Sequence, residues 1–279
     1  MQNRVDLLVV GAGPAGSTAA RYAAEQGADV LLIDKKTEIG VPVCCGELLP
    51  SRDLMASAFP NAPGLDELFP IEPALVRRRI RRIIATSPRG RGYEFPMDGC
   101  TVDRDAFDRH LADAAVCRGA VLQAGTKFLR LDGRRVTTSQ GVYEADVVIA
   151  ADGPLSPVCR AAGMARHLKL APAVTCQAAG EFGDAVRIFF GNGVAPGGYA
   201  WIIPKGGRAN VGLGIQSPGT PLRPLLDAFL ASNGLAADSM QAGFVPVSGP
   251  ACETVRGHVL AVGDAAGHVV ASNGGGITI

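Results

Sequence analysis

The feature that most constrains the fold is a glycine motif near the N-terminus, Gly11-Ala-Gly-Pro-Ala-Gly16. It follows the short apolar run Val5 to Val10 and precedes a segment, Ser17 to Gln26, whose small residues suit a helix packed on a sheet. A second apolar run, Asp29 to Ile33, ends at the acidic residue Asp34. A strand, a glycine turn, a helix and a second strand within about thirty residues form a βαβ unit, which predicts a parallel sheet.

Each of the three glycines of this motif has a distinct role in a dinucleotide-binding site. Gly11 permits a tight turn, Gly13 lets the backbone approach a pyrophosphate, and Gly16 lets the helix pack closely on the strand. The free N–H groups at the start of the helix attract phosphate. Asp34 stands 18 residues after Gly16 and would accept hydrogen bonds from ribose hydroxyls. The alternative is a glycine-rich turn between strand and helix that binds no ligand.

A second nucleotide signature lies near the other end of the chain, Leu260-Ala-Val-Gly-Asp-Ala-Ala-Gly267. A buried strand that ends in Gly-Asp and leads into a predicted helix places Asp264 near the middle of a long dinucleotide. FAD carries its ribitol hydroxyls at that position. A simple NAD dehydrogenase does not need a second nucleotide-binding motif so late in its sequence. The two signatures together therefore favour FAD over NAD.

The composition narrows the class of protein. Of 279 residues, 47% are hydrophobic and 19% are charged, so we expect a sizeable core and no extended disorder. A formal net charge of +1 argues against a dedicated nucleic-acid binder. No apolar run is long enough to predict a membrane span, and the N-terminal apolar residues are interpreted as a strand rather than a signal peptide.

Cysteine and histidine usage predicts neither a disulfide framework nor a metal site. The seven cysteines are odd in number and form no CxxC pair, which fits reduced thiols in a cytoplasmic protein. The four histidines, His110, His167, His258 and His268, show no metal-ligand spacing and are expected to be structural or exposed.

The remaining segments predict an α/β fold with two parts. Alternation and turn signals predict a strand pair over 75–95, a helix from Asp103 to about Cys117, a strand over 120–124, a β-meander over 126–143 and a fully buried strand over 146–151. Between about 170 and 250, turn-separated strands and one helix, Leu222 to Ala231, predict an antiparallel sheet. We therefore expect a Rossmann-type FAD-binding domain and an inserted antiparallel β-sheet substrate domain. The expected boundaries are 1–74, 96–168 and 251–279 for the first domain, and 75–95 and 169–250 for the second.

The segment PGGYAWIIPKGGRANVGLGI, Pro196 to Ile215, resembles the Pro-x-x-Tyr-x-Trp-x-x-Pro pattern of the geranylgeranyl reductase family. In VPVCCGELLP, Cys45-Gly46 resembles that family's cysteine-glycine element on the loop over the flavin. The acid that follows is closer to the archaeal-type digeranylgeranylglycerophospholipid reductases than to the chlorophyll-pathway branch. Asp103-Arg104 and Ala150-Ala-Asp-Gly153 resemble elements of the wider flavoprotein hydroxylase and reductase superfamily.

This resemblance implies an FAD-dependent enzyme that hydrogenates isolated carbon–carbon double bonds of isoprenoid chains in membrane-lipid precursors. One alkene carbon would receive a hydride from reduced FAD, and the other would receive a proton. The implied partners are an isoprenoid lipid, an electron donor (ferredoxin, NAD(P)H or a deazaflavin) and a membrane surface contacted peripherally. FAD contacts are implied for Gly11, Gly13, Ala15, Gly16, Asp34, Lys35, Cys45, Gly46, Arg104, Ala124, Asp264, Gly276 and Ile277.

The adjacent cysteines Cys44 and Cys45 are too close for an unstrained disulfide. Neighbours in an extended segment point opposite ways, so only one can face the flavin. The resemblance selects Cys45, and Cys44 is then expected to be a small buried filler. Three roles stay open for Cys45: packing against the flavin ring, protecting the site from oxygen, or donating a proton as a catalytic acid. If Cys45 does not donate it, the proton would come from water or from Glu47.

Two further features have both a functional and a structural interpretation. Tyr199 and Trp201 flank Ala200 on a predicted strand and therefore share a face, which would form a wall of an apolar substrate slot or simply pack in the sheet. The arginines of Val76-Arg-Arg-Arg-Ile-Arg-Arg82 would line the solvated rim of a strand pair. Alternatively, they would contact a lipid phosphate, an anionic membrane or an acidic electron donor.

The chain stops at GGGITI, where the family continues with a C-terminal helical region, so a fragment lacking that region is expected.

Two other interpretations compete with an isoprenoid reductase. A flavin-dependent monooxygenase of the same fold would show substrate-dependent oxygen uptake with NADPH. An inactive FAD-binding fragment would bind FAD and reduce no isoprenoid.

Overall fold

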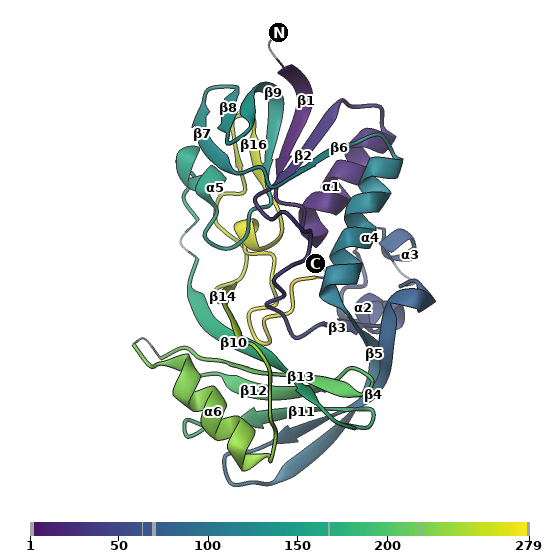
Figure 1. Ribbon diagram of the computed structural model, residues 1–279, viewed down its shortest axis with the longest axis vertical. Coiled ribbons are helices and arrows are strands. Elements are labelled where there is room, and N and C mark those ends of the chain that lie inside the picture. The colour runs from purple at the N-terminus through teal and green to yellow at the C-terminus, as the bar shows by residue number, and fades with distance from the viewer. Residues whose placement is uncertain (1–2, 63, 69–70, 167, 218, 278–279) are drawn as a thin grey trace. The chain divides into compact units, whose positions relative to one another are not determined.

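The computed structural model of the protein describes residues 3–62, 64–68, 71–166, 168–217 and 219–277. The chain divides into two compact units, each built on its own sheet (Figure 1). Unit 1 comprises residues 1–41, 105–170 and 245–279, and unit 2 comprises residues 42–104 and 171–244. His167 lies outside the described residues. Within the described ranges, no helix has both the length and the apolar character that a membrane crossing requires.

The sheet of unit 1 is mainly parallel. Its strands are β1 Asn3–Val10, β2 Val30–Asp34, β6 Val121–Ala124, β7 Phe128–Asp132, β8 Arg135–Thr138, β9 Gly141–Ala150, β15 Val255–Arg256 and β16 Val259–Ala261. The order is β15-β16-β9-β1-β2-β6, with β16, β9, β1, β2 and β6 parallel to one another. Strands β7 and β8 extend the sheet from β9 as an antiparallel meander, which confirms the predicted meander.

Helices and the meander cover the two faces of this sheet. Helices α1 Pro14–Glu25 and α4 Arg104–Cys117 lie on one face (Figure 1). There Ala20 and Ala112 share a core with Val9 and Leu32. On the other face, the short helix α5 Pro157–Ala161 and the β7–β8 meander bury the alternate residues of the strands. Both faces of the sheet are therefore shielded from water, which explains why its strands are continuous apolar runs in the sequence.

The predicted βαβ unit is confirmed, with the helix starting at Pro14 rather than Ser17. Proline suits the first helical position because its missing N–H has no partner there in any case. The late Gly-Asp motif differs from expectation. Within the described residues it forms one 3-10 turn, η2 Gly263–Ala266, and not a regular helix. Gly267 ends that turn in the left-handed conformation, which stops the helix from propagating.

The sheet of unit 2 is mainly antiparallel. Its strands are β3 Leu48–Pro50, β4 Val76–Thr86, β5 Gly92–Val102, β10 Leu170–Ala179, β11 Ala185–Phe190, β12 Tyr199–Pro204, β13 Arg208–Gly214 and β14 Gln241–Pro246. They lie in the order β14-β10-β13-β12-β11-β4-β5-β3. In this sheet β11 and β4 run parallel, whereas the β10–β13, β13–β12, β12–β11, β4–β5 and β5–β3 pairs are antiparallel. The helical segments are α2 Arg52–Ala58, α3 Leu65–Leu68, η1 Pro73–Leu75 and α6 Leu222–Ser232.

The two faces of this sheet differ in character. Helix α6 packs Leu226 and Phe229 against one face, where Ala200, Ile202 and Val211 are buried. The alternate residues of the same strands point to the opposite face, because successive side chains of a strand alternate. That face carries the predicted aromatic pair, Tyr199 and Trp201, and most of the polar cluster described below.

The compact units do not follow the boundaries expected from sequence. Strand β5 does not end at residue 95 but continues to Val102, and its last residues pair with β3. Residues 42–74 and 96–104, which we expected in the FAD-binding domain, therefore group with unit 2. Strands β4 and β5 thus form one long hairpin, whose pairing is interrupted by two register shifts but continues from Val76 and Val102 to the turn.

Candidate functional site

The nucleotide motifs of unit 1 leave the sheet at the carboxyl ends of neighbouring parallel strands. Gly11 follows β1, Asp34 ends β2, Asp152 lies just after β9, and Gly263 follows β16 by one residue. Open parallel sheets bind their ligands at this edge. The order β16-β9-β1-β2 therefore brings together motifs that are up to about 250 residues apart in the sequence.

The three glycines of the first motif have different surroundings. A Cβ at Gly11 would lie 2.2 Å from the carbonyl oxygen of Ala151, and one at Gly16 would lie 1.8 Å from the carbonyl oxygen of Gly11. These two positions must be glycine for the strands and helix to approach. A Cβ at Gly13 would meet nothing within 4 Å. Gly13 is the N-cap of α1 and has no side-chain cap, so open space faces the helix N-terminus, as a pyrophosphate requires.

Asp34 organises the turn beside this space. Its Oδ2 accepts a hydrogen bond from the N–H of Ala12 at 2.7 Å, and its Oδ1 accepts one from the N–H of Lys36 at 2.9 Å. Each oxygen keeps a second lone pair for a ribose hydroxyl. Ala124 pairs with Asp34 across the strands, whereas Lys35 is exposed.

The late motif contacts the first one directly. A Cβ at Gly263 would lie 2.7 Å from the Cβ of Ala15, so the η2 turn lies against the start of α1. A Cβ at Gly276 would lie 3.3 Å from Oδ1 of Asp264, and Ile277 is half-buried next to it in the chain. The sequence-predicted cofactor residues of unit 1 therefore gather at one edge, and this edge fits a dinucleotide such as FAD.

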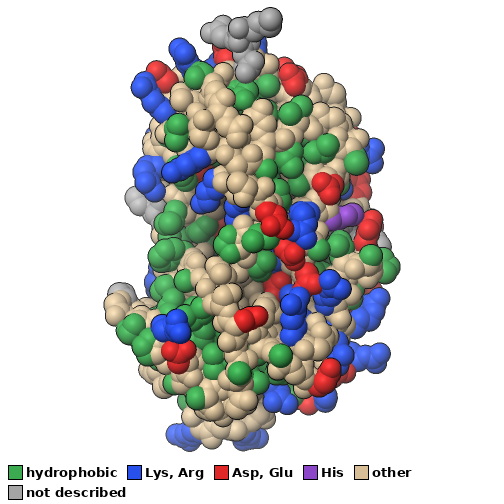
Figure 2. Space-filling model, viewed as in Figure 1, with side chains coloured by type: hydrophobic (Ala, Val, Ile, Leu, Met, Phe, Trp, Pro, Cys, Tyr) green, Lys and Arg blue, Asp and Glu red, His purple; other side chains and the backbone are tan. Residues whose placement is uncertain are grey.

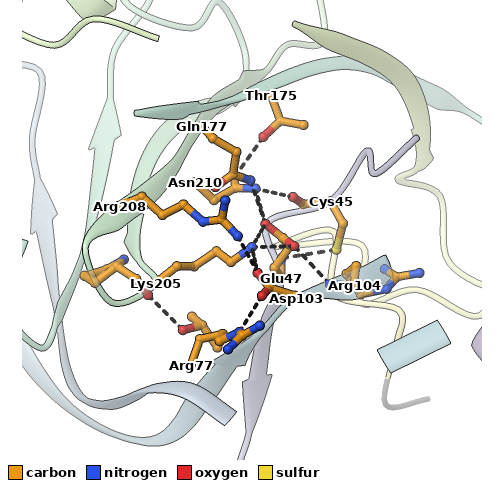
Figure 3. Close-up of polar contacts among 12 residues, drawn as sticks. Cys45, Glu47, Arg77, Asp103, Arg104, Thr175, Gln177, Lys205, Arg208 and Asn210 are labelled. Carbon is orange, nitrogen blue, oxygen red and sulfur yellow. Dashed lines mark hydrogen bonds and ion pairs between the residues drawn. The ribbon is translucent and has the colours of Figure 1, made fainter. Parts of the chain in front are cut away.

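The remaining predicted cofactor residues, Cys45, Gly46 and Arg104, belong to unit 2 and lie around the carboxylate of Glu47, which the sequence suggested only as an alternative proton source and not as a buried group. Glu47 is 2% exposed. Figure 3 shows it at the centre of a polar cluster, which we define as Glu47, Asp103, Gln177, Lys205 and Asn210.

The carboxylate of Glu47 accepts five hydrogen bonds. Lys205 Nζ donates to both oxygens at 2.8 Å. The backbone N–H of Arg104 donates to Oε1 at 3.1 Å, while Gln177 Nε2 and Asn210 Nδ2 donate to Oε2 at 2.8 and 2.9 Å. Donors from four residues therefore hold this carboxylate in one orientation, and the carboxylate in turn fixes its neighbours.

Lys205 bridges two buried carboxylates. Besides Glu47, its Nζ lies 2.6 Å from Oδ1 of Asp103, and the three side chains are at most 8% exposed. Arg77 and Arg208 also pair with Asp103, Arg208 at 3.0 Å. Burial alone raises the pKa of Asp103, but the hydrogen bonds and charges of Lys205 and Arg77 outweigh it and lower the pKa to about 2.

Asn210 connects this cluster to the aromatic pair. Its Nδ2 donates to the carbonyl oxygen of Cys45 at 2.7 Å as well as to Glu47. Its Oδ1 accepts from the indole N–H of Trp201 and from the hydroxyl of Thr175, both at 2.8 Å. All four hydrogen-bonding positions of the amide are thus used in a side chain that is fully buried.

The Cys45 loop is held against the sheet by these contacts. Glu47 has a φ of +62°, which is uncommon for any residue except glycine and persists only where the surroundings impose it. The N–H of Glu47 donates to Cys45 Sγ at 3.2 Å. A Cβ at Gly46 would lie 3.1 Å from Ile203, so the loop lies close to β12. The prediction for Cys44 was wrong, because Cys44 is exposed and not a buried filler. Cys45 is half-buried, so the two neighbours do differ in exposure, but the side on which Cys44 lies is open to solvent.

Tyr199 and Trp201 share a face, as predicted. Their ring centroids lie 5.8 Å apart. Burial, with a smaller effect from the nearby Cys45, raises the pKa of Tyr199. Gly212 is the cross-strand neighbour of Trp201, and a Cβ there would lie 2.4 Å from the indole. The indole therefore lies flat over β13, where only glycine leaves room for it.

The alternation of residues along two strands could have predicted part of the polar cluster from sequence. Alternation along β12 continues from Trp201 and Ile203 to Lys205, just past its end, and alternation along β13 puts Arg208 and Asn210 on the same face. Glu47 and Gln177 gave no such signal, because their meeting depends on strand order and on the path of a loop.

Most of the arginines of β4 have structural partners. Arg77 pairs with Asp103, Arg78 donates to the carbonyl oxygen of Gly183, and Arg82 pairs with Glu94 and Asp184. Basic and acidic side chains are interspersed over the surface shown in Figure 2, as the small net charge leads one to expect. Arg79 and Arg81 are exposed.

Two segments of the sequence match known protein families. Residues 6–125 match a family model described as FAD dependent oxidoreductase, and residues 174–245 match one described as geranylgeranyl reductase catalytic domain. Digeranylgeranylglycerophospholipid reductase 2 of Methanopyrus kandleri is 40% identical over 98% of this chain and 73% of its own length. The digeranylgeranylglycerophospholipid reductase of Methanocaldococcus jannaschii is 38% identical over the same shares.

Solved structures share the fold. A geranylgeranyl bacteriochlorophyll reductase-like protein from Thermoplasma acidophilum has a TM-score of 0.84 at 29% identity, over 100% of this chain and 75% of that chain. A flavin-dependent monooxygenase solved with FAD and substrate has a TM-score of 0.69 at 20% identity, over 94% of this chain and 53% of that chain, which is a likeness of fold alone.

Proposed function

Since the chain belongs to the geranylgeranyl reductase family of FAD-dependent oxidoreductases, we propose that it hydrogenates isolated carbon–carbon double bonds in the geranylgeranyl chains of a membrane-lipid precursor. One observation carries the proposal. The Cys45 loop is held on the same face of the unit 2 sheet as Tyr199 and Trp201, the aromatic pair of the family's pattern. The two curated relatives described above are named digeranylgeranylglycerophospholipid reductases, and this chain spans about three quarters of their length.

When bound, FAD supplies the hydride that one alkene carbon receives. The residues of unit 1 have binding roles in the proposal. Gly13 and the N-terminus of α1 hold the pyrophosphate, Asp34 holds a ribose, and Asp264 holds the ribitol. The three positions lie at the same edge of one sheet, which supports these assignments.

The second alkene carbon must receive a proton, and in our proposal Cys45 donates it. Glu47 is a poor alternative, because its two oxygens already accept five hydrogen bonds. Cys45 Sγ accepts the N–H of Glu47, so its own S–H remains available to donate. A positioned general acid typically contributes about a hundred- to ten-thousand-fold to a rate.

A single-turnover experiment tests the function. The FAD-loaded protein is reduced with dithionite under anaerobic conditions, mixed with a glycerophospholipid that carries two geranylgeranyl chains, and the lipid is followed by mass spectrometry. We expect the gain of two hydrogens per reduced bond. Cys45→Ala should keep FAD and lose at least about a hundred-fold in rate, whereas the matched change at exposed Cys44 should have little effect.

Other outcomes would contradict the proposal. Unreduced lipid with a fully reduced flavin would favour a chain that binds FAD without this activity. Substrate-dependent oxygen uptake with NADPH would favour a monooxygenase. A wild-type rate for Cys45→Ala would assign the proton to water and leave the thiol a packing role.

The electron donor and a membrane contact are further parts of the proposal. Ferredoxin, NAD(P)H and a deazaflavin are compared as donors by the rate at which each reduces the bound flavin.

For the membrane, we propose that exposed Arg79 and Arg81 of β4 and the exposed Phe95 of β5 contact an anionic lipid surface. Changing both arginines to Gln should lower sedimentation with phosphatidylglycerol vesicles, while the same changes at exposed Arg130 and Arg223 serve as the control. Equal sedimentation of both double variants would refute the contact.

A further inference from the structure

Asn210 is the single side chain in the described part of the chain that hydrogen-bonds to both the Cys45 loop and Trp201. On one side it donates to the backbone of Cys45 and to Glu47. On the other side it accepts from the indole of Trp201 and from Thr175. Its amide has two donors and two acceptors, and each has a partner within 2.9 Å.

The burial of Asn210 makes these contacts specific. The side chain is 0% exposed, and a buried amide that lost a partner would carry the full cost of its desolvation. A rotation of the amide by half a turn would place its N–H group against the indole N–H and its oxygen against the carbonyl of Cys45. Both pairs would then repel, so only one orientation satisfies the site.

The backbone around Asn210 is equally constrained. Ile203 and Gln177 are its cross-strand neighbours on β12 and β10, so its Cα is fixed in the middle of the sheet. The Cys45 loop has no ladder of its own, since residues 41–47 form no regular element. The hydrogen bond from Asn210 to the Cys45 carbonyl is therefore a tie between a rigid strand and an irregular loop.

We infer that Asn210 is a positioning residue, which sets the place of Cys45 relative to Trp201 and so aligns the proton donor with the substrate. This inference rests on the proposed function for its catalytic consequence, but the tie itself is independent of the reaction. Glu47 assists because its backbone is held at a positive φ and its carboxylate, which also accepts from Lys205, accepts the amide N–H of Asn210.

The test uses Asn210→Asp in the full chain with FAD bound. Aspartate has the same shape and still accepts from Trp201 and Thr175, but it cannot donate to Cys45 and it repels Glu47. We expect FAD content to stay unchanged and the loop to be released. Cys45 is half-buried in the intact loop, and a thiol reacts faster as it becomes more exposed, so the rate of Cys45 alkylation by iodoacetamide, measured by peptide mass spectrometry, should rise at least about ten-fold.

Internal and external controls accompany this measurement. Exposed Cys117 should react at the same rate in both proteins, since it lies on α4 in unit 1 and not in the released loop. The matched substitution is Asn192→Asp, at an exposed residue of the same unit whose side-chain oxygen accepts from the N–H of Gly197. It keeps that hydrogen bond and should leave both alkylation rates unchanged. If Asn210→Asp does not fold, Thr175→Val removes one hydrogen bond to Asn210 and should raise Cys45 alkylation by a smaller factor.

Kinetics distinguish positioning from a structural role. In single turnovers with the geranylgeranyl lipid, we expect Asn210→Asp to lower the rate of reduction at saturating lipid by about ten- to a hundred-fold and to leave half-saturation within about three-fold. Unchanged Cys45 alkylation in the folded Asn210→Asp and Thr175→Val proteins would overturn the inference whatever the activity. If alkylation rises but the wild-type protein reduces no geranylgeranyl lipid, the tie stands and the proposed function fails.

Discussion

Replacing Lys205 by Met tests whether the polar cluster stabilises unit 2. Lys205 is buried between Glu47 and Asp103, with Nζ–O distances of 2.8 and 2.6 Å, and Met fills a similar volume without charge. Removing one partner of a buried ion pair typically costs about 3–5 kcal/mol. Asp103 would keep Arg77 and Arg208, and Glu47 would keep three neutral donors. We therefore expect the lower end of that range, a loss of about 3 kcal/mol in the free energy of unfolding.

Urea unfolding at pH 7 measures this loss. The chain has one tryptophan, Trp201, which lies in the unit 2 sheet, so its fluorescence reports on this unit. Working without FAD avoids the added stability that a ligand contributes. With a urea dependence of about 1–3 kcal/mol per molar, a loss of about 3 kcal/mol moves the midpoint by roughly 1–3 M.

Two comparisons make the result decisive. Arg223→Met removes an exposed ion pair with Asp227 on α6 and should cost at most about 0.5 kcal/mol. Adding Glu47→Gln to Lys205→Met removes the uncompensated charge, so the double variant should be less destabilised than the sum of the two single changes. A Lys205→Met protein that unfolds with the midpoint of Arg223→Met would refute the stabilising role of the cluster.

Three further outcomes are expected. Because the pKa of Asp103 is lowered to about 2 from its ordinary value of 3.8, this carboxyl contributes about 2 kcal/mol of stability above pH 4, and the contribution disappears as the pH falls from 4 towards 2. Asp103→Asn should therefore be less stable than wild type at pH 7 and equally stable near pH 2 in acid titrations, and an equal difference at both pH values would contradict this. Gly212→Ala should cost about 1–3 kcal/mol or more and shift Trp201 emission, since the new methyl would lie 2.4 Å from the indole, while Gly193→Ala has open space and should change neither quantity. Asp34→Ala should lower FAD affinity about ten- to a hundred-fold in titrations, and an unchanged affinity would remove Asp34 from the site.

The local features of unit 1 could be predicted from sequence because each depends on residues close together in the chain. The turn at Gly11, the strand that ends at Asp34 and the helix that ends at Cys117 all follow from periodicity and glycine placement. The pairing of Tyr199 with Trp201 is equally local, since residues two apart on a strand share a face. The family pattern added the cofactor and the chemistry, which local physics does not contain.

The polar cluster was decided by tertiary structure alone. Glu47 meets Lys205 and Asn210 across 158 and 163 positions of sequence, through the strand order of the unit 2 sheet and the path of an irregular loop. The same loop leaves Cys44 exposed, against expectation, and holds Glu47 at a positive φ while residues distant in the sequence bind its carboxylate. Sequence alone therefore determines which segments become strands, helices and glycine turns. The tertiary structure decides which buried charges compensate one another, because it brings distant strands together. A carboxylate can be buried only where cations and N–H donors converge on it.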